Sequence, residues 1–264
     1  MRLFDRIFRQ KRTKLAGLRY MQPSDQKMWL AAQKSQISPS CDCLKPQFDG
    51  GNFGELNFHA EVQDTTCDAW RFLEAMIQSV ISDNSEEFAP GLAMKPEMWS
   101  QIVVLPQSIA NLKSVRKLYL YGSHLVRIPP EIGEMENLEE FDAYTSYRLH
   151  WLPYEITRCQ KLKRSRMSTR ALYGNYKYRP PFPRLGIEHK MSVEKCSVCQ
   201  RTLSPGSINQ VWISLRIATD VLPLLVNACS EECVQRLPPP FKGYVNHPHK
   251  GGLNLQQPPT GFKC

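Results

Sequence analysis

Apolar residues between Leu105 and Leu172 recur with a period of 23 to 24 residues, far longer than the period of any single helix or strand. Three copies align, and they start at Leu105, Ile128 and Leu152. The aligned positions are Leu105, Pro106, Ile109, Leu112, Val115, Leu118, Leu120 and Leu125; then Ile128, Pro129, Ile132, Met135, Leu138, Phe141, Ala143 and Leu149; then Leu152, Pro153, Ile156, Cys159, Leu162, Ser165, Met167 and Leu172. A repeat of this length predicts stacked units of one short strand and one return segment, which bury their apolar edges only against neighbours.

The wording of the copies, LPQSIANLKSVRKLYLYGSHL and then IPPEIGEMENLEEF, resembles the intracellular class of leucine-rich repeat with its L-P-x-x-I-x-x-L-x-x-L phrase. The resemblance implies a curved binding surface and does not name what is bound. We therefore expect an α/β fold: a short leucine-rich repeat solenoid with an N-terminal helical cap and a small C-terminal zinc module.

Each unit contains a strand of the form x-L-x-L-x, and alternation with period two sends the x residues to the outer, concave face. The outward positions are Lys117, Tyr119, Tyr121, Glu140, Asp142, Tyr144, Arg164, Arg166 and Ser168. Tyrosine and arginine are the residues that most often anchor interfaces. We predict that a protein partner binds here; the alternative is an ordinary solvated strand face.

Two features depart from the family. Where the family places an asparagine that links neighbouring units, this chain has Ser123, Ser146 and Arg170, so that ladder is weak or replaced. Three units are also close to the minimum for a stable stack, and its ends need covers.

The sequence offers a cover at each end of the stack. On the N-terminal side, Asp68 can cap a helix, and the partly matching segment from Leu92 to Val104 follows it. The apolar face of that helix consists of Phe72, Leu73, Met76, Ile77 and Val80. On the C-terminal side, aromatic residues alternate with basic residues and proline at Tyr173, Tyr176, Tyr178 and Phe182. We expect them to seal the last unit; stacking on nucleic-acid bases is the alternative.

Two cysteine pairs, Cys196-x2-Cys199 and Cys229-x3-Cys233, lie 29 residues apart. Four thiolates in two close pairs match a closed tetrahedral zinc site. Between them, alternation from Val211 to Ile217 predicts a half-buried strand, and a turn at Thr219-Asp220 leads to a second strand, from Val221 to Val226. A short helix with Cys229 and Cys233 at its start would then follow and favour the thiolate form of both. Knuckle, hairpin and helix resemble a treble clef, and CSEEC is similar to TRASH-type members, although the gap is long and Ala228 replaces a common aromatic residue.

The remaining cysteines and histidines fit no common zinc pattern. Cys41 and Cys43 lie near His59 and Cys67 in the chain, and the four could form a second metal site. We favour the alternative, that these cysteines are free thiols, because their spacing fits no usual structural zinc pattern. Cys159 occupies a core position of the third unit. His247 and His249 fall in a Gly- and Pro-rich tail that we expect to be a flexible end, with metal binding there the weaker alternative.

Composition limits the class of protein. The 264 residues have 42% hydrophobic content and no apolar run long enough to span a bilayer. Residues 1–20 combine seven basic residues with Leu3, Phe4, Ile7 and Phe8 at helical spacing. Such a helix packs on the protein body, or else it contacts an anionic membrane surface or an acidic partner, or serves as a transit peptide. Nine cysteines, four with metal spacing, indicate a reducing, cytoplasmic location.

No nucleophile elbow, phosphate-binding loop or H-E-x-x-H phrase is present, so we predict a non-enzymatic protein-binding chain. The alternative is a nucleic-acid-binding protein, because the net charge is +9 and basic residues cluster at Lys161, Lys163, Arg164, Arg166, Arg170, Lys177, Arg179 and Arg184. The expected organisation is a basic N-terminal helix and irregular segment (1–67), a helical cap (68–104), repeats and C-terminal flank (105–185), a four-cysteine zinc module (190–240) and a flexible tail (241–264).

Overall fold

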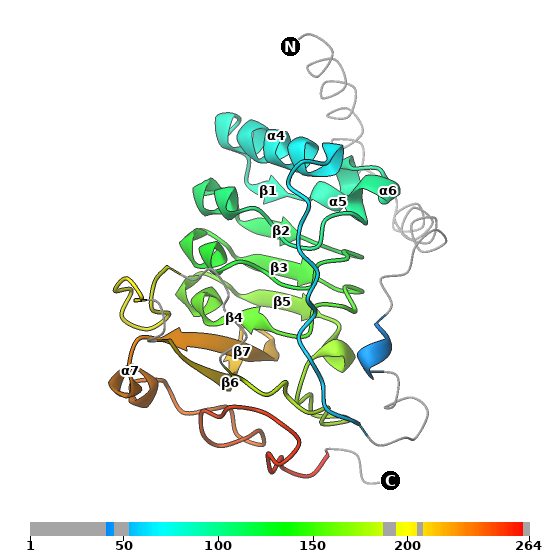
Figure 1. Ribbon diagram of the computed structural model, residues 1–264. Coiled ribbons are helices and arrows are strands. Elements are labelled where there is room, and N and C mark those ends of the chain that lie inside the picture. The colour runs from blue at the N-terminus through cyan, green and yellow to red at the C-terminus, as the bar shows by residue number, and fades with distance from the viewer. Residues whose placement is uncertain (1–40, 45–52, 187–193, 205–207, 261–264) are drawn as a thin grey trace.

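The computed structural model describes residues 41–44, 53–186, 194–204 and 208–260, so the basic segment 1–20 lies outside the described residues. The fold is mixed α/β, with few helices and a parallel sheet at its centre (Figure 1). Among the described residues, no helix has both the length and the apolar character that crossing a bilayer requires.

The central sheet has four parallel strands in the order β1-β2-β3-β5. They are β1 (Glu87–Phe88), β2 (Lys117–Tyr119), β3 (Glu140–Ala143) and β5 (Arg164–Met167). Lys117 lies beside Glu140, and Glu140 lies beside Arg164, so residues aligned in the repeat are neighbours in space. The 23- to 24-residue period is therefore the register of this sheet.

The return segments are short 3₁₀ helices that lie together on one side of the strands (Figure 1). They are η2 (Gln107–Asn111), η3 (Pro130–Glu134) and η4 (Tyr154–Arg158), and each follows a proline of the repeat phrase at its N-cap. Each of these helices contains one isoleucine, Ile109, Ile132 or Ile156, whose side chain is buried in the core. A Cβ on Gly133 would lie 2.7 Å from the Glu155 carbonyl oxygen, so glycine permits this close packing of η3 on η4.

The N-terminal end of the sheet is covered by α4 (Asp68–Ser82), followed by α5 (Pro90–Ala93) and α6 (Pro96–Trp99). The expected apolar face of α4 is present, with Leu73, Met76 and Ile77 buried. The cap differs from the prediction: Cys67 is the N-cap, its Sγ accepts from the Trp70 N–H at 3.4 Å, and Asp68 is the first helical residue. The cover is also not purely helical, because β1 pairs with β2 and extends the sheet.

Serine hydroxyls replace the asparagine ladder between the units. Ser146 Oγ donates to the Leu120 carbonyl at 3.0 Å and accepts from the Ser123 N–H at 3.1 Å and from Ser123 Oγ at 2.7 Å. The next rung is Ser168, whose Oγ accepts from the Thr145 N–H at 2.8 Å, and not Arg170. Because Ser168 is buried in this ladder, its predicted place on the outward surface is wrong.

A second sheet, in the order β4-β7-β6, covers the C-terminal end. It consists of β4 (Leu152–Pro153) and the antiparallel hairpin of β6 (Asn209–Ile217) and β7 (Asp220–Ala228), which α7 (Glu231–Gln235) follows. Leu152 of the third unit pairs in parallel with Leu224. One cluster of buried apolar residues includes members from α4, the repeated units, β6, β7 and α7, so the hairpin shares the core of the repeated units.

Strand β6 is more buried than its alternation predicts. Trp212 and Ser214, expected to face outward, are buried, and Arg216 is exposed. The Trp212 side chain packs in an aromatic cluster with Trp151, Tyr173 and Phe182. Tyr173 and Phe182 belong to the segment that follows η5 (Thr169–Ala171). Tyr173 and Phe182 therefore cover the last unit, as expected for a seal. Tyr178 is half-buried, and Tyr176 is exposed, so its expected part in the seal is wrong.

The tail is not a free end over residues 241–260. The His249 carbonyl accepts from the Trp212 N–H at 2.8 Å, and the His249 N–H donates to the Trp212 carbonyl at 3.1 Å. Arg179 adds a hydrogen bond of 2.6 Å to the Gly243 carbonyl. The prediction of a flexible tail is wrong here because backbone pairing with the β6 edge outweighs the chain entropy that Gly and Pro suggested.

We expect Ser146→Ala to lower the free energy of unfolding by about 1 to 3 kcal/mol, because it leaves buried polar groups of two units without their hydrogen-bond partner. Urea denaturation measures this loss. Ser82→Ala removes an exposed hydroxyl near the end of α4 and serves as the matched control, with a change within about 0.5 kcal/mol. Equal effects of the two changes would contradict a structural role for the ladder.

Burial lowers the pKa of His249 from 6.5 to about 3, with the nearby His247 as a lesser cause. Below pH 6.5 the imidazole of His249 is protonated in the unfolded chain but not in the folded chain. The free energy of unfolding should therefore fall by about 1.4 kcal/mol per pH unit as the pH decreases from 6.5 toward 3. The stability advantage of the wild type over His249→Gln should therefore shrink with acidification, as measured by urea unfolding across pH. The exposed His247→Gln control should change the pH profile only slightly, because His247 is the lesser cause of the shift. Parallel profiles for the wild type and His249→Gln would contradict this prediction.

Candidate metal centres and the exposed sheet face

The four predicted zinc cysteines come together at the end of the hairpin away from β5. Cys196 and Cys199 lie in a tight turn in which the Gln200 N–H donates to the Cys196 carbonyl at 3.0 Å, and Gln200 has a left-handed φ of 63°. Cys229 directly follows β7. Cys233 lies inside α7, where its N–H donates to Oγ of the N-cap Ser230 at 3.4 Å. Only Cys233, and not Cys229, is therefore within the helix that was expected to begin with both.

The ligand atoms of Cys196, Cys199, Cys229 and Cys233 all lie within 4.8 Å of one another, and we call this group the four-cysteine set. Cys229 Sγ is 3.5 Å from Cys199 Sγ and 3.6 Å from Cys233 Sγ. A disulfide would need about 2.05 Å, whereas a tetrahedron of sulfurs around zinc has edges of about 3.8 Å, given a Zn–S length of about 2.3 Å. The spacing therefore fits a shared metal ion.

Neighbouring groups shift the thiol pKa values of the four-cysteine set in opposite directions. The Arg201 side chain donates to Cys199 Sγ at 3.4 Å, and this hydrogen bond lowers the pKa of Cys199 to about 6. Hydrogen bonding with Cys199 and Cys233 raises the pKa of Cys229 to about 12. Backbone N–H groups of Cys199 and Cys229 point at Cys196 Sγ, at 3.5 and 3.4 Å. These donors would offset part of the double negative charge of four thiolates on a divalent cation.

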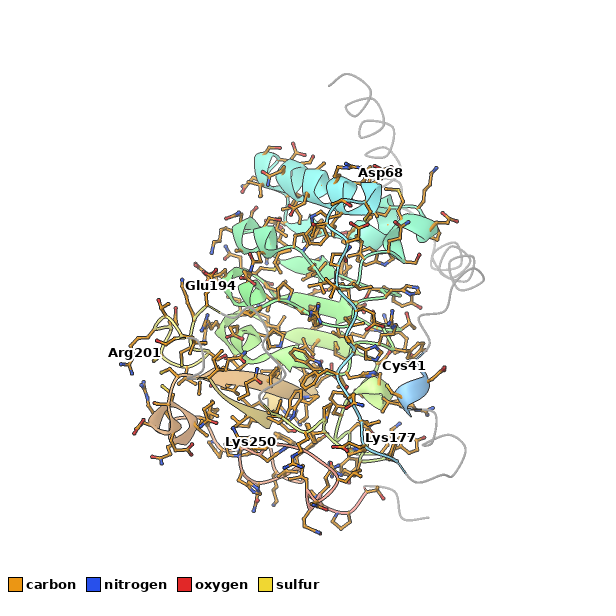
Figure 2. All side chains as sticks on the ribbon, in the orientation of Figure 1. Cys41, Asp68, Lys177, Glu194, Arg201 and Lys250 are labelled. Atoms are coloured by element: carbon orange, nitrogen blue, oxygen red, sulfur yellow. The ribbon has the colours of Figure 1, made fainter. Side chains whose placement is uncertain are left out.

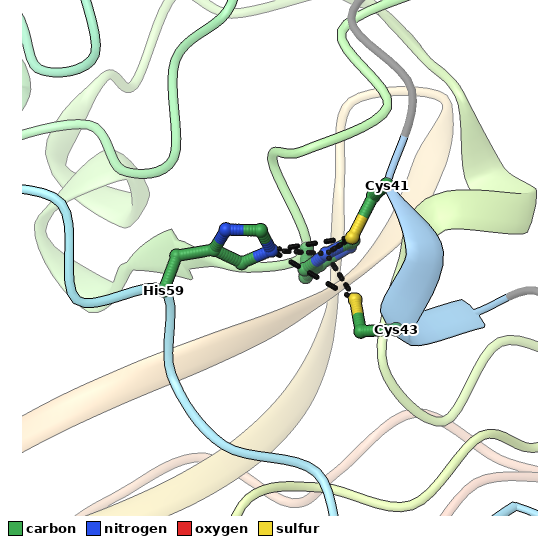
Figure 3. A group of neighbouring side chains, drawn as sticks. Cys41, Cys43 and His59 are labelled. Carbon is green, nitrogen blue, oxygen red and sulfur yellow. Dashed lines mark hydrogen bonds between the residues drawn. The ribbon is translucent and has the colours of Figure 1, made fainter.

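A second cluster joins Cys41, Cys43, His59 and His150, and their ligand atoms also lie within 4.8 Å of one another. Cys41 and Cys43 flank the start of η1 (Asp42–Leu44), and Figure 3 shows their side chains and that of His59 converging from separate segments. His150 Nε2 is 3.2 Å from Cys41 Sγ, 3.1 Å from Cys43 Sγ and 3.1 Å from His59 Nε2. Mixed sulfur and nitrogen tetrahedra have edges of about 3.3 to 3.8 Å, so this mixed cluster also fits a metal ion.

The hydrogen bond between the two thiols lowers the pKa of Cys41 and raises the pKa of Cys43, so a thiolate is favoured at Cys41. The two clusters are separate sites: Arg201, beside the four-cysteine set, and Cys41 lie on opposite sides of the molecule (Figure 2).

His150 is a candidate ligand that the sequence patterns did not indicate. The sequence groups Cys41 and Cys43 with His59 and Cys67 and favours free thiols, but the Cys67 Sγ instead donates to the Asp64 carbonyl and caps α4. A signal was present in the repeat: two residues before the start of each unit stand Val103, Val126 and then His150. A histidine at a position that is otherwise valine is the mark of a special role.

The predicted outward residues of β2, β3 and β5 share one face, with Ser168 excepted. Arg164 pairs with Glu140 at 2.8 Å, and Arg166 pairs with Asp142 at 3.5 Å. Tyr119 donates to Glu140 at 3.3 Å, and burial together with the Glu140 charge raises the pKa of Tyr119 to about 12.

Just beyond the strand ends, two tyrosines continue this face. The rings of Tyr121 and Tyr144 lie 6.0 Å apart, and the Arg166 guanidinium lies 4.5 Å above the Tyr144 ring. The exposed fraction of Tyr144 is 38%. The strand face and the two tyrosines together form a surface of paired charges with one exposed ring, Tyr144, and one half-buried ring, Tyr121.

No protein-family model matches the chain, and a search of curated proteins finds no sequence that matches it.

We expect Cys229→Ser to remove one equivalent of bound metal per chain, because a hydroxyl is a poor ligand for a metal that three thiolates hold. Elemental analysis of the purified protein measures this. Hydrogen exchange should accelerate from Cys196 to Leu237, and less so from Leu152 to Leu172, because β4 pairs with β7. Cys159→Ala, at a buried thiol outside both clusters, should keep the full metal content.

Unchanged metal content in Cys229→Ser would exclude the four-cysteine set as a metal site. If the metal is lost but exchange becomes faster only after Cys196, the metal site stands. That result would contradict only the coupling of the site to the third unit.

Proposed function

We propose that this chain is a non-enzymatic interaction protein that binds a protein partner on the exposed face of its four-stranded parallel sheet. The observation that carries the proposal is the surface formed by Tyr121, Tyr144 and Arg166 beside the paired charges of β3 and β5. Large aromatic rings with polar tips supply contact area at low entropic cost, and arginine adds directional hydrogen bonds.

The proposal includes a leucine-rich repeat solenoid as the scaffold. Its support is the parallel register of equivalent residues and the recurrence of a proline N-cap before η2, η3 and η4. In solenoids of this type, the strands line the concave face, which is the usual docking surface.

We further propose that the four-cysteine set binds a structural zinc ion. Four thiolates leave no open coordination position, and soft ligands in a tetrahedral array select zinc over magnesium or calcium. The order of cysteine turn, hairpin and cysteine-bearing helix supports the treble-clef likeness. The proposal places the chain in the cytoplasm, and its support is that the described cysteines form no disulfide with one another, since disulfides are rare where the surroundings are reducing.

Ion pairing favours a protein partner over a nucleic acid. Of the basic cluster, Lys163, Arg164 and Arg166 pair with Glu139, Glu140 and Asp142. Arg179 is buried and directs its guanidinium at backbone carbonyls, at 3.1 Å for Gly174 and 2.6 Å for Gly243. Cations that are already paired within the protein release fewer counterions from a phosphate backbone, so they contribute less to nucleic-acid affinity.

We expect the double variant Tyr121→Ala, Tyr144→Ala to lose most partner capture in a pull-down from the protein's own cells with quantified bait. Its free energy of unfolding should change by less than about 0.5 kcal/mol at the exposed Tyr144. The change at the half-buried Tyr121 should be larger but well below the roughly 3 to 5 kcal/mol that loss of a core aromatic costs. Tyr176→Ala, at an exposed tyrosine on the C-terminal flank, is the matched control and should capture the partner at the wild-type level.

Equal capture by all three proteins would contradict the proposed face, and a sharp fall in the melting temperature of the double variant would show that the tyrosines are core residues. Retention on immobilised DNA or RNA that weakens steeply with salt would instead support nucleic-acid binding.

A further inference from the structure

We propose that Cys41, Cys43, His59 and His150 hold a second zinc ion, and that this ion fastens an extended segment across the repeated units. The segment, residues 53–63, has no regular secondary structure and runs beside the strand ends from the level of the hairpin up to α4 (Figure 1). We name it the strap.

The geometry of the two histidines points to a cation. His150 Nδ1 lies 2.5 Å from the Ala171 carbonyl oxygen, so the other ring nitrogen, Nε2, faces the cluster. His59 Nδ1 lies 3.4 Å from the Glu61 carboxylate and 3.5 Å from the Arg148 guanidinium, so its Nε2 faces the cluster as well. The two Nε2 atoms are only 3.1 Å apart, and both cysteine sulfurs lie beside them. One metal ion could bind all four atoms, and such carbonyl and carboxylate partners on Nδ1 are typical of metal-binding histidines.

The charge of the mixed cluster also fits zinc. Zinc would be held by two thiolates and two uncharged imidazole nitrogens, and binding would release to solvent any thiol proton that the two cysteines still carry. A divalent cation with this donor set is neutral overall, which suits a site where His150 is buried. Two sulfurs and two nitrogens in a tetrahedral array are a common structural zinc set, although the spacing of these four residues in the chain matches none of the usual motifs.

The strap touches the same place in each repeated unit, in reverse chain order. Gln63 Oε1 accepts from the Val103 N–H at 2.8 Å before the first unit, and the Glu61 carbonyl accepts from Arg127 at 3.0 Å before the second. Before the third unit, His59 meets His150.

Beyond these contacts, the strap enters the aromatic cluster at the C-terminal end. Phe58 stacks on Trp212 with ring centroids 5.4 Å apart and meets Trp151 edge-on at 5.7 Å. An extended segment held by so few hydrogen bonds loses chain entropy on docking, and a metal crosslink can offset that loss.

The test measures zinc by elemental analysis on the full chain, and we expect two equivalents per chain in the wild type. Cys41→Ser with Cys43→Ser should leave one, carried by the four-cysteine set. Cys67→Ser is the matched control, because Cys67 is a neighbouring thiol outside the mixed cluster and serine is a good N-cap, so it should keep two. His59→Gln, at a half-buried ligand, serves as a second variant should the cysteine variant fail to fold.

Cobalt replacement identifies the site independently. Refolding with cobalt should give the intense visible bands of tetrahedral coordination, and the part lost in the Cys41, Cys43 variant should be the spectrum of a mixed sulfur and nitrogen set.

The fastening role has its own readout. Hydrogen exchange across residues 53–63 should accelerate at least several-fold in the zinc-deficient variant, while exchange in α4 stays at the wild-type rate. One zinc in the wild type, removed by Cys229→Ser, would overturn the second site. Two zincs in the Cys41, Cys43 variant would also overturn it, and loss of one zinc without faster exchange in the strap would overturn the fastening role. None of these results depends on partner capture.

Discussion

The junction between the last strand of the repeats and the C-terminal hairpin is the contact on which the rest of the structure depends. Ser165 of β5 stands in register with Phe141 and Leu118, where an apolar side chain would leave the last unit with an open edge. Its carbonyl accepts from Thr219 Oγ1 at 2.6 Å, and its hydroxyl lies 2.9 Å from the Ile217 carbonyl and 2.8 Å from Asp220. The turn of the hairpin thereby closes the sheet, and the short stack needs no further units.

Two candidate metal clusters and an aromatic cluster then surround this closed end. The four-cysteine set lies at the far ends of β6 and β7, and His150 of the mixed cluster lies beside Tyr173, with ring centroids 5.1 Å apart. The side chain of Trp212, in β6, contacts Phe58 of the strap as well as Phe182 and Trp151. The sheet face with Tyr121 and Tyr144 stays clear of these covers, which is why a small domain can present it without an exposed core.

Periodic features were predictable from the sequence, and long-range ones were not. The register of β2, β3 and β5, the hairpin and the four-cysteine set each follow from a local pattern or a spacing. Strand β1, the burial of Trp212 and the pairing of His249 depend on what a distant segment covers, so period and composition misread them. His150 was hidden because its partners lie more than 90 residues away in the chain.

The reverse course of the strap has a consequence for the order of folding. Residues 59 and 150 are 91 positions apart, and Cys41 and His150 are 109 apart, whereas neighbouring units are joined by contacts only 23 or 24 positions apart. Closing such long loops costs more chain entropy than stacking successive units, so high contact order delays these contacts. The strap contacts all three units and the hairpin, so we expect it to dock after they have formed. The N-terminal segment would then complete a domain whose later-synthesised half forms first.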